Sequence, residues 1–357
     1  MYDGATVGVV VPAYNEHGFV GEVIETVPAF VDRVYVVDDC STDGTWEEIR
    51  ETLRALHAPV SPRAEPRLTG DGAGSGWRDR IEATVVRPDE EGPDRRFVAV
   101  RHEPNTGVGG AIKTGYRAAV ADDVDVVAVM SGDGQMSPDI LDRIIHPVVS
   151  GDADFSKGNR LRNAEYRDDM SPWRTFGNFL LTYLTRISSG YWRMMDPQNG
   201  YTAISRYALE NVGIGAMYEY YGYCNDMLVK LNAKGMRIAD VAMPAVYGDE
   251  RSSINYPTYI RKVSGMLLKN FLWRLKVKYL VLDFHPLALF YYFGAAMVLL
   301  GILGGGWSLY AKFVFDDPLF VRASSSLLLF SMGSMFLMFA MLFDMQVNRD
   351  KEVQMME

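Results

Sequence analysis

The sequence has few of the residues that build disulfide frameworks and metal centres. It holds two cysteines, Cys40 and Cys224, which are too few for a disulfide scaffold and fit a reducing compartment. Its five histidines show no metal-ligand spacing. No lysine precedes Lys113, and no basic segment precedes the first apolar run, Thr6–Val11. We therefore expect no secretory signal peptide before that run.

The sequence also has fewer basic than acidic residues. The 357 residues carry 36 Lys and Arg against 45 Asp and Glu, which gives a formal net charge of −9. A protein that neutralises nucleic-acid phosphates needs an excess of Lys and Arg. The composition therefore argues against a nucleic-acid partner, and the length leaves room for more than one domain.

Polar and acidic residues follow three valine-rich runs at the point where each run ends. Thr6–Val11 is followed by PAYNE, Arg33–Val37 by DDCSTDG, and Val126–Met130 by SGDGQ. Apolar runs without polar alternation are typical of strands buried on both faces of a parallel sheet. Ligands of open α/β sheets bind at the carboxyl ends of the strands, so we expect these polar residues to face one crevice.

Asp133 and Gln135 lie in the segment Val124–Pro138, around which the chain is organised. A carboxylate and an amide oxygen one residue apart can hold a hard divalent cation beside phosphates. The alternative is a plain surface turn, because Gly-Asp-Gly is also ordinary turn chemistry. Turn propensity does not easily explain why two further buried strands also end in acid, and this favours a site.

The rest of residues 1–255 alternates between helical and strand patterns. The expected helices are Glu16–Phe30, Thr45–Leu56, Ala111–Ala121, Ile140–Val149, Pro172–Ser188 and Tyr218–Lys234, and the further strands are Phe97–Arg101, Asp154–Lys157, Thr202–Ser205 and Met236–Met243. Ala58–Arg96 breaks the pattern because it is rich in Pro, Gly, Arg and Asp. We expect a largely disordered surface insertion there.

The glycine-rich segment Asn105–Ala111 invites comparison with nucleotide-binding motifs, and the comparison fails. A P-loop is excluded because Tyr116 stands where the lysine belongs, and the dinucleotide fingerprint is excluded because Ile112 stands at its third glycine. What remains is a turn of small residues at a helix N-terminus, which can place backbone N–H groups near an anion.

The segment Tyr256–Phe284 is amphipathic. One helical face carries Ile260, Val263, Leu267, Phe271 and Leu275, while positive charge and aromatic edges come from Arg261, Lys262, Lys269, Lys276, Lys278, Trp273 and Tyr279. A basic, aromatic-edged helix of this kind is typical of a membrane interface.

Two segments without a charged residue follow, Pro286–Ala311 and Ala323–Phe343. Each is longer than the roughly 20 residues that cross a ~30 Å hydrocarbon core, and a buried core helix of that length and composition is the weaker alternative. The short link Lys312–Arg322 makes them a hairpin over residues 285–345, with a tail over 346–357. Basic residues before the first span and after the second predict, by the positive-inside rule, that the domain before the hairpin and the tail lie in the cytoplasm, as in a multi-pass protein of the cell membrane.

Taken together, six motifs in order resemble an inverting glycosyltransferase of family two, close to the dolichyl-phosphate and polyprenyl-phosphate sugar synthases. They are VVVPAYNE, VVDDCSTDGT, NTGVGGAIKTGY, SGDGQMSP, KGNR and DPQNGY. The resemblance covers roughly Val7–Ser253 apart from the insertion. It implies the GT-A fold, an α/β domain with a doubly wound sheet that binds a nucleotide sugar, and it matches the C-terminal transmembrane pair of the polyprenyl group.

The resemblance also implies roles for individual residues. The donor would be bound by Pro12, Tyr14, Asn15, Glu16, Asp38, Asp39, Ser41, Asn105, Gly107, Lys113, Ser131 and Asp133. Asp133 and Gln135 would hold Mg²⁺ or Mn²⁺ on the donor phosphates. Arg160, Arg174 and Gln198 would bind the acceptor phosphate, and the candidates for catalysis are Asp133, Asp196 and Asp226.

One position departs from the family pattern. The metal motif of the family usually reads Asp-x-Asp-x-Gln, and Ser131 replaces its first aspartate here. Ser131 can hydrogen-bond a phosphate or a metal-bound water, but it brings no charge. The departure puts the affinity for the metal, and with it the metal dependence, in question.

These observations predict transfer of a hexose from a nucleoside diphosphate or monophosphate sugar to dolichyl or polyprenyl phosphate at a membrane. One alternative is a transferase that extends a lipid-linked sugar, where the acceptor hydroxyl would need a general base such as Asp226. Another is a non-catalytic membrane protein that senses nucleotide sugar, with Ser131 marking lost activity. A processive polysaccharide synthase is disfavoured because its Gln-x-x-Arg-Trp motif is absent.

Overall fold

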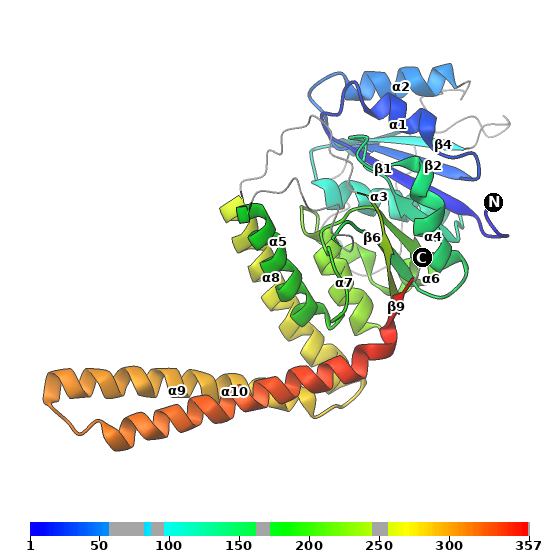
Figure 1. Ribbon diagram of the computed structural model, residues 1–357. Coiled ribbons are helices and arrows are strands. Elements are labelled where there is room, and N and C mark those ends of the chain that lie inside the picture. Colours follow the sequence, from blue (N-terminus) through cyan, green and yellow to red (C-terminus); the bar gives the residue numbers. More distant parts are fainter. Residues whose placement is uncertain (57–81, 87–95, 162–171, 245–255, 356–357) are drawn as a thin grey trace.

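A nine-stranded sheet forms the centre of the described part of the chain, with strand order β3-β4-β2-β1-β5-β7-β6-β8-β9 (Figure 1). The computed structural model describes residues 1–56, 82–86, 96–161, 172–244 and 256–355. The strands are β1 (Val7–Ala13), β2 (Arg33–Asp38), β3 (Glu82–Val86), β4 (Phe97–Glu103), β5 (Val126–Val129), β6 (Phe155–Asn159), β7 (Thr202–Ser205), β8 (Ile238–Ala242) and β9 (Glu352–Gln354).

Two hydrophobic clusters cover the two faces of the sheet. Helices α1 (Val20–Thr26), α2 (Thr45–Ala55) and α4 (Leu141–Val149) pack on one face, and α3 (Val108–Ala121), α6 (Arg206–Asn211) and α7 (Tyr223–Ala233) pack on the other. The alternation of side chains along β1 explains the division, because Val9 and Val11 point to the first cluster and Val10 to the second. The predicted α/β architecture with helices on both faces is confirmed.

The sheet is mixed, whereas the sequence predicted a parallel one. Strand β5 runs parallel to β1 but antiparallel to β7, and β7 is also antiparallel to β6. Thr202 at the start of β7 pairs with Val129 at the end of β5. The connection from β6 through α5 (Pro172–Ser189) therefore brings the chain back to the carboxyl edge of β5, and β7 runs down from there.

Two strands were not expected. Strand β3 lies inside the predicted insertion and pairs antiparallel with β4 at the edge of the sheet. Its sequence, EATVV, is β-branched enough to extend a sheet even though its surroundings are polar. Residues 57–81 and 87–95 of the insertion lie outside the described residues.

Strand β9 corrects the predicted end of the domain. Ile238–Ala242 was expected to lie in the last strand, but Glu352–Gln354 returns from the far end of the chain and pairs parallel with it. The tail that the sequence placed outside the sheet is thus its last strand. A three-residue strand carries too little apolar pattern to be recognised in the sequence.

Helix α8 (Tyr256–Lys276) continues into a π-helical segment (Val277–Leu282), and its predicted apolar stripe is not exposed. Val263 and Leu267 are buried against Leu181 of α5, and Leu275 is buried at the base of the hairpin. Lys278 is buried as well. The stripe that was expected to face a membrane therefore holds the helix to the protein.

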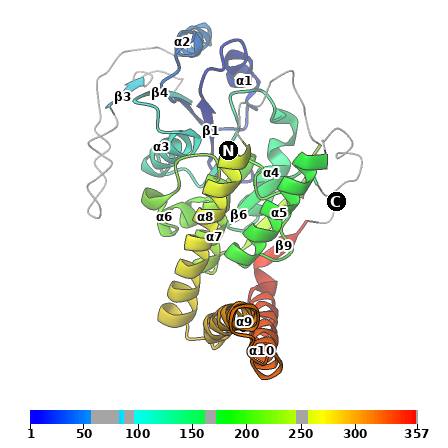
Figure 2. The ribbon, with the colours of Figure 1, turned by 90° about the vertical axis from the view of Figure 1, so that its left-hand side faces the viewer.

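A different side of α8 is exposed. It combines Leu268, Leu272 and Trp273, which are 61%, 46% and 40% exposed, with the exposed basic residues Arg261, Lys262, Lys269 and Lys276. Phe179 of the neighbouring α5 is 69% exposed. Figures 1 and 2 show α5 and α8 side by side on the flank of the domain from which the hairpin projects.

Helices α9 (Leu287–Phe315) and α10 (Phe320–Asn348) form the predicted hairpin, which extends crosswise to α8 (Figure 1). Both are long and apolar enough to cross a membrane by length and composition. Glycines allow the two backbones to touch: a Cβ on Gly301 would lie 2.7 Å from Phe330 N, and one on Gly333 would lie 2.6 Å from Val298 N. Most of the other apolar side chains face outward.

Candidate functional site

The candidate site lies where the order of the strands reverses. From β1 the chain moves outward through β2 to β4 and then returns to place β5 on the other side of β1. The backbone N–H of Gly132, just after β5, donates to the carbonyl of Pro12 at 3.0 Å. A Cβ on Gly132 would lie 3.1 Å from that carbonyl oxygen, so the loop after β5 packs against the carboxyl end of β1.

The loop after β1 is tied to the loop after β2. Asn15 has φ +58°, its N–H donates to the Ser41 hydroxyl at 2.9 Å, and its side-chain oxygen accepts from Thr42 N at 2.9 Å. Pro12 is buried, Glu16 is half-buried and Tyr14 is 47% exposed. The loops that were predicted to bind the nucleotide are therefore joined by hydrogen bonds through Asn15, Ser41 and Thr42. We call these three residues the nucleotide rim, and the exposed ring of Tyr14 is next to Asn15 in the chain.

Asp38 is fully buried beneath that rim. Its Oδ2 lies 3.3 Å from Arg101 Nε, and its Oδ1 accepts from Ser41 N at 3.2 Å. Burial raises the pKa of Asp38, although the Ser41 hydrogen bonds and the Arg101 charge oppose the shift. The geometry gives Asp38 a role inside the protein, and direct contact with the donor stays a prediction.

Asp39 holds the glycine-rich turn in place. Its Oδ1 accepts from His102 Nδ1 at 2.8 Å and from Thr106 N at 2.9 Å, and its Oδ2 accepts from Gly107 N at 2.7 Å. The Asn105 side chain donates to the carbonyl of Asp39 at 2.9 Å. Because Asp39 is only 2% exposed, it binds the turn before any ligand arrives, and its contact with a nucleotide is likewise still a prediction.

Lys113 is buried and faces the loop that precedes α7. Its Nζ lies 2.8 Å from Glu219 Oε1. The same loop packs so closely on the turn that a Cβ on Gly107 would lie 2.5 Å from the Glu219 carbonyl oxygen, and one on Gly109 would lie 2.3 Å from that of Tyr218. Only glycine fits at these two positions, and the Lys113–Glu219 pair joins α3 to the loop before α7.

Asp133 and Gln135 lie in the loop after β5, and both are half-buried. Asp133 Oδ1 accepts from Gln135 N at 3.0 Å, and Ser131 N lies 3.2 Å from Met136 Sδ. No group of three or more His, Cys, Asp or Glu side chains that could hold a metal occurs in the described ranges. One carboxylate and one amide nevertheless fit Mg²⁺ or Mn²⁺, because such ions are commonly held by one or two protein oxygens together with substrate phosphates.

Tyr221 lies in the loop that precedes α7 and packs on the glycine-rich turn, and the sequence analysis did not single it out. Its ring is 56% exposed. Partial burial raises the pKa of Tyr221, and so do the nearby Glu16 and Asp133 carboxylates. Both carboxylates belong to the predicted donor site, Glu16 next to Asn15 of the nucleotide rim in the chain and Asp133 in the metal loop.

The predicted acceptor residues form a second group next to the metal loop. Arg160 binds Asp196 through two bonds, Nε to Oδ2 at 2.8 Å and Nη2 to Oδ1 at 3.0 Å. Burial alone would raise the pKa of Asp196, but the hydrogen bonds and charge of Arg160 and the charge of Lys157 outweigh it, and the pKa is lowered. Asp196 is therefore an anion that orients Arg160, and this state does not suit it to take a proton.

Gln198 offers a donor to the same region. Its Nε2 is buried and has no hydrogen-bond partner in the part of the chain that the structure describes. The Tyr201 hydroxyl, three residues on, donates to the carbonyl of Ser137 at 2.9 Å, which joins the acceptor loop to the metal loop. Arg174 lies in the first turn of α5, but its side chain lies outside the described residues.

Asp226 is positioned by three partners and is 3% exposed. It accepts from Tyr218 N at 2.9 Å and from Asn270 Nδ2 of α8 at 2.7 Å, and it pairs with Lys230. A general base needs an oxygen within reach of the substrate proton. This arrangement favours a role in joining α7 to α8 over the role of base.

Arg101 and His102 were missed, although a signal was present. They follow Phe97–Val100 as the polar end of a buried strand, the same pattern that marked Asp38 and Asp39. Tyr221 had no such signal, because it lies in a loop that only the folded chain brings to the crevice.

Comparison with known proteins identifies the family. The model of the family described as glycosyl transferase family 2 matches residues 8–66 and 84–213. A UDP-N-acetylglucosamine–dolichyl-phosphate N-acetylglucosaminyltransferase of Methanococcus voltae is 24% identical over 239 residues, which cover 67% of this chain and 84% of that protein.

Solved structures are more distant. Glucosyl-3-phosphoglycerate synthase of Mycobacterium tuberculosis in complex with Mg²⁺ and UDP is 20% identical with a TM-score of 0.46, over 76% of this chain and 79% of that one. S. aureus TarS 1–349 in complex with UDP-GlcNAc is 13% identical with a TM-score of 0.44, over 97% and 92%. Because both TM-scores are below 0.5, the family assignment rests on the sequence match.

Proposed function

The chain belongs to glycosyl transferase family 2, and on this premise we propose that it transfers a hexose, with inversion, from a nucleotide sugar to a polyprenyl or dolichyl phosphate at the cytoplasmic face of a membrane. It is a nucleotide-sugar-dependent glycosyltransferase with a GT-A-like mixed α/β sheet. The finer proposal concerns the acceptor and the place of reaction.

The observation that carries the proposal is the position of the hairpin relative to the acceptor group. Helices α9 and α10 leave the domain from the flank where α5 and α8 expose apolar and basic side chains (Figure 2). Soluble monomers rarely expose apolar patches larger than a few hundred Å². With α9 and α10 across a bilayer, α5 and α8 would lie along its surface, and the crevice would open beside lipid head groups.

The proposed transfer requires that the donor and the acceptor are held in position and that the charge on the leaving phosphate is neutralised. The rim formed by Asn15, Ser41 and Thr42 would hold the nucleoside, and Asp133 with Gln135 would hold the divalent cation on the donor phosphates. The cation, when bound, neutralises the charge that develops on the leaving phosphate. The oxygen of an acceptor phosphate is already anionic, so no strong base is needed, which agrees with the engaged state of Asp226.

Arg160 and Gln198 would receive the acceptor phosphate. The Arg160 fork is held by Asp196, and the buried Gln198 amide has a donor to spare. Arg suits a phosphate because its guanidinium is always charged and carries five N–H donors, more than one carboxylate uses. Arg174 is the third proposed contact.

The test is a matrix of nucleotide sugars against polyprenyl phosphates and lipid-linked sugars, with detergent-purified protein, Mg²⁺ or Mn²⁺, and product detection by mass. We expect a glycosylated lipid phosphate and one equivalent of released nucleotide. Transfer only to lipid-linked sugars would instead support chain extension. Release of no nucleotide with any pair would support the sensor alternative.

A further inference from the structure

The end of the chain holds the loop that carries the acceptor residues. Glu352 of β9 accepts hydrogen bonds from three successive backbone N–H groups: Oε1 from Trp192 at 2.7 Å, and Oε2 from Arg193 at 2.7 Å and from Met194 at 2.8 Å. Asp196 and Gln198 follow directly. A single side chain therefore bonds three consecutive peptide groups of a loop more than 150 residues earlier in the sequence.

The start of the same loop rests against the hairpin. Gly190 has φ +79°, and a Cβ there would lie 2.3 Å from Arg274 Nη1 and 3.2 Å from Asn348 Nδ2. Arg274 is fully buried and pairs with Asp344 of α10 at 2.8 Å. The last turns of α10 and strand β9 thus contact the loop at two points.

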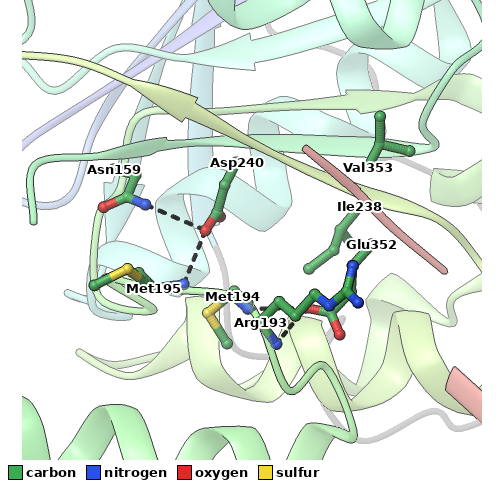
Figure 3. Close-up of a pocket in the computed structure, with 8 residues that line it drawn as sticks. All are labelled: Asn159, Arg193, Met194, Met195, Ile238, Asp240, Glu352 and Val353. Atoms are coloured by element: carbon green, nitrogen blue, oxygen red, sulfur yellow. Dashed lines mark hydrogen bonds between the residues drawn. The ribbon is translucent and has the colours of Figure 1, made fainter. Parts of the chain in front are cut away.

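The sheet holds the other end of the loop. Met195 N donates to Asp240 Oδ2 at 2.8 Å, and Lys157 Nζ lies 2.9 Å from Asp240 Oδ1 and 3.1 Å from the carbonyl oxygen of Asp196. Glu352, Asp240, Met194 and Met195 line one small cavity, and Figure 3 shows the Asp240 carboxylate bonded to the backbone of Met195 there. Asp196 therefore reaches Arg160 from a loop that is fixed on both sides.

We propose that Glu352 is a positioning residue of the transferase: by binding the Trp192–Met194 amides it sets the acceptor loop, and so makes acceptor binding depend on the return of the hairpin to the sheet. The function of the loop rests on the proposed function above. The position of the loop does not, because it follows from the contacts of Glu352.

The plainer interpretation is that Glu352 only closes the edge of the sheet. Strand pairing itself uses backbone groups and needs no carboxylate: β8 pairs with β9 through Ile238↔Glu352, Ala239↔Val353 and Asp240↔Gln354. The Glu352 side chain is directed at the loop instead. One carboxyl group that accepts three consecutive backbone N–H groups can therefore decide the position of the loop.

The test compares the full-length variants Glu352→Gln and Glu352→Asp with the matched control Glu210→Gln, which removes a charge from an exposed pair with Arg206. Hydrogen exchange of the Trp192–Met194 amides reports the loop without any substrate. Kinetics with polyprenyl phosphate and nucleotide sugar report KM for each substrate and kcat.

In Glu352→Gln we expect amide exchange at Trp192–Met194 to rise by roughly tenfold or more, the factor that corresponds to about 1.4 kcal/mol. We expect the acceptor KM to rise by a similar factor while the donor KM stays within about twofold. Glu352→Asp should recover part of both effects, because it keeps the charge but is shorter. The control should match the wild type.

Wild-type amide exchange and an unchanged acceptor KM in Glu352→Gln would overturn the proposal. Faster exchange with a normal acceptor KM would overturn the positioning role and leave a structural contact. If the wild type fails to use polyprenyl phosphate, the function proposed above fails, and the exchange data still decide whether Glu352 holds the loop.

Discussion

At the scale of single residues, the site depends on carboxylates with different tasks. Asp39 and Asp226 are buried and saturated with protein donors, while Asp133 is half-buried and bonded to its own loop. A carboxylate that must bind a ligand has to keep an accessible oxygen, and burial separates these roles more clearly than sequence does. Asp133 is the residue for which we expect the largest functional effect.

Asp133→Asn should lower turnover by about 10²–10³ without loss of folding, because it removes one preorganised charge from the site and touches no core residue. Steady-state kinetics at saturating Mn²⁺ and a thermal melt measure the two quantities. The matched control is Asp139→Asn, an exposed aspartate six residues on, which should behave like the wild type. A variant that keeps half of its activity would remove Asp133 from the metal site.

Ser131→Asp should tighten binding of the metal, because it adds a second carboxylate two residues before Asp133. The measurement is the Mn²⁺ concentration that gives half-maximal activity, which we expect to fall. If that concentration stays the same or rises, Ser131 lies outside the reach of the metal.

Glu352 should also give stability a dependence on pH. Burial raises the pKa of Glu352 to about 7 against the opposing effect of its three backbone hydrogen bonds, and Asp240 adds to the rise. Tyr191 and Arg193 are the other titratable groups that face it. A raised carboxyl pKa means that the folded state binds the proton more tightly than the unfolded state does. The contribution of Glu352 to the free energy of unfolding is therefore complete below pH ~4.5 and is lost as pH rises through about 7.

Thermal melts of the wild type and Glu352→Gln between pH 5 and pH 8 measure the effect. The wild type should lose stability across this window relative to the variant, whose uncharged amide cannot titrate. Parallel profiles for the two proteins would contradict the raised pKa.

At the scale of elements, the hairpin is held by backbone contact. Gly333 lies so near α9 that even one added carbon would meet Val298 N at 2.6 Å, whereas a Cβ on Gly305 of α9 meets nothing within 4 Å. Both residues are glycines in apolar helices, but only Gly333 lies where the two backbones touch. Only the packing of α9 on α10 distinguishes them.

Gly333→Ala should therefore destabilise the hairpin, because the two helices must move apart and lose contact along their length. Gly305→Ala is the matched control and should leave stability unchanged. The midpoint of unfolding in detergent measures both variants. Equal midpoints would show that the close approach is not needed.

At the scale of the whole molecule, strand β3 at the edge of the sheet limits how much of the insertion can be deleted. Deleting residues 69–81 should leave activity near the wild-type level, because that stretch has too little apolar content to contribute a core. Deleting residues 69–89 also removes β3 and exposes the backbone edge of β4. The longer deletion should therefore aggregate more and transfer sugar more slowly than the shorter one, and both quantities are measured for both deletions.

Equal behaviour of the two deletions, whether both are active or both are lost, would contradict the role assigned to β3. The amount of monodisperse protein after purification is the direct readout, and activity per folded molecule follows from it.

The sequence by itself determined the strands that end in acid, the placing of Asp133 and Gln135 after β5, and the charge-free hairpin. These depend on local patterns: valine runs, short polar loops and lengths that match a bilayer. Even the family could be recognised from motifs that each lie within a dozen residues. Boundaries followed to within a few residues for most elements.

The tertiary structure alone decided which side chains are bound to partners inside the protein and which are left to face the predicted site. Lys113 pairs with Glu219, Arg160 pairs with Asp196, and the apolar stripe of α8 is covered by α5. Glu352 returns over more than 150 residues to bind the acceptor loop. Such contacts join segments that are distant in the sequence, and their energy depends on burial and on partners, which no local pattern contains.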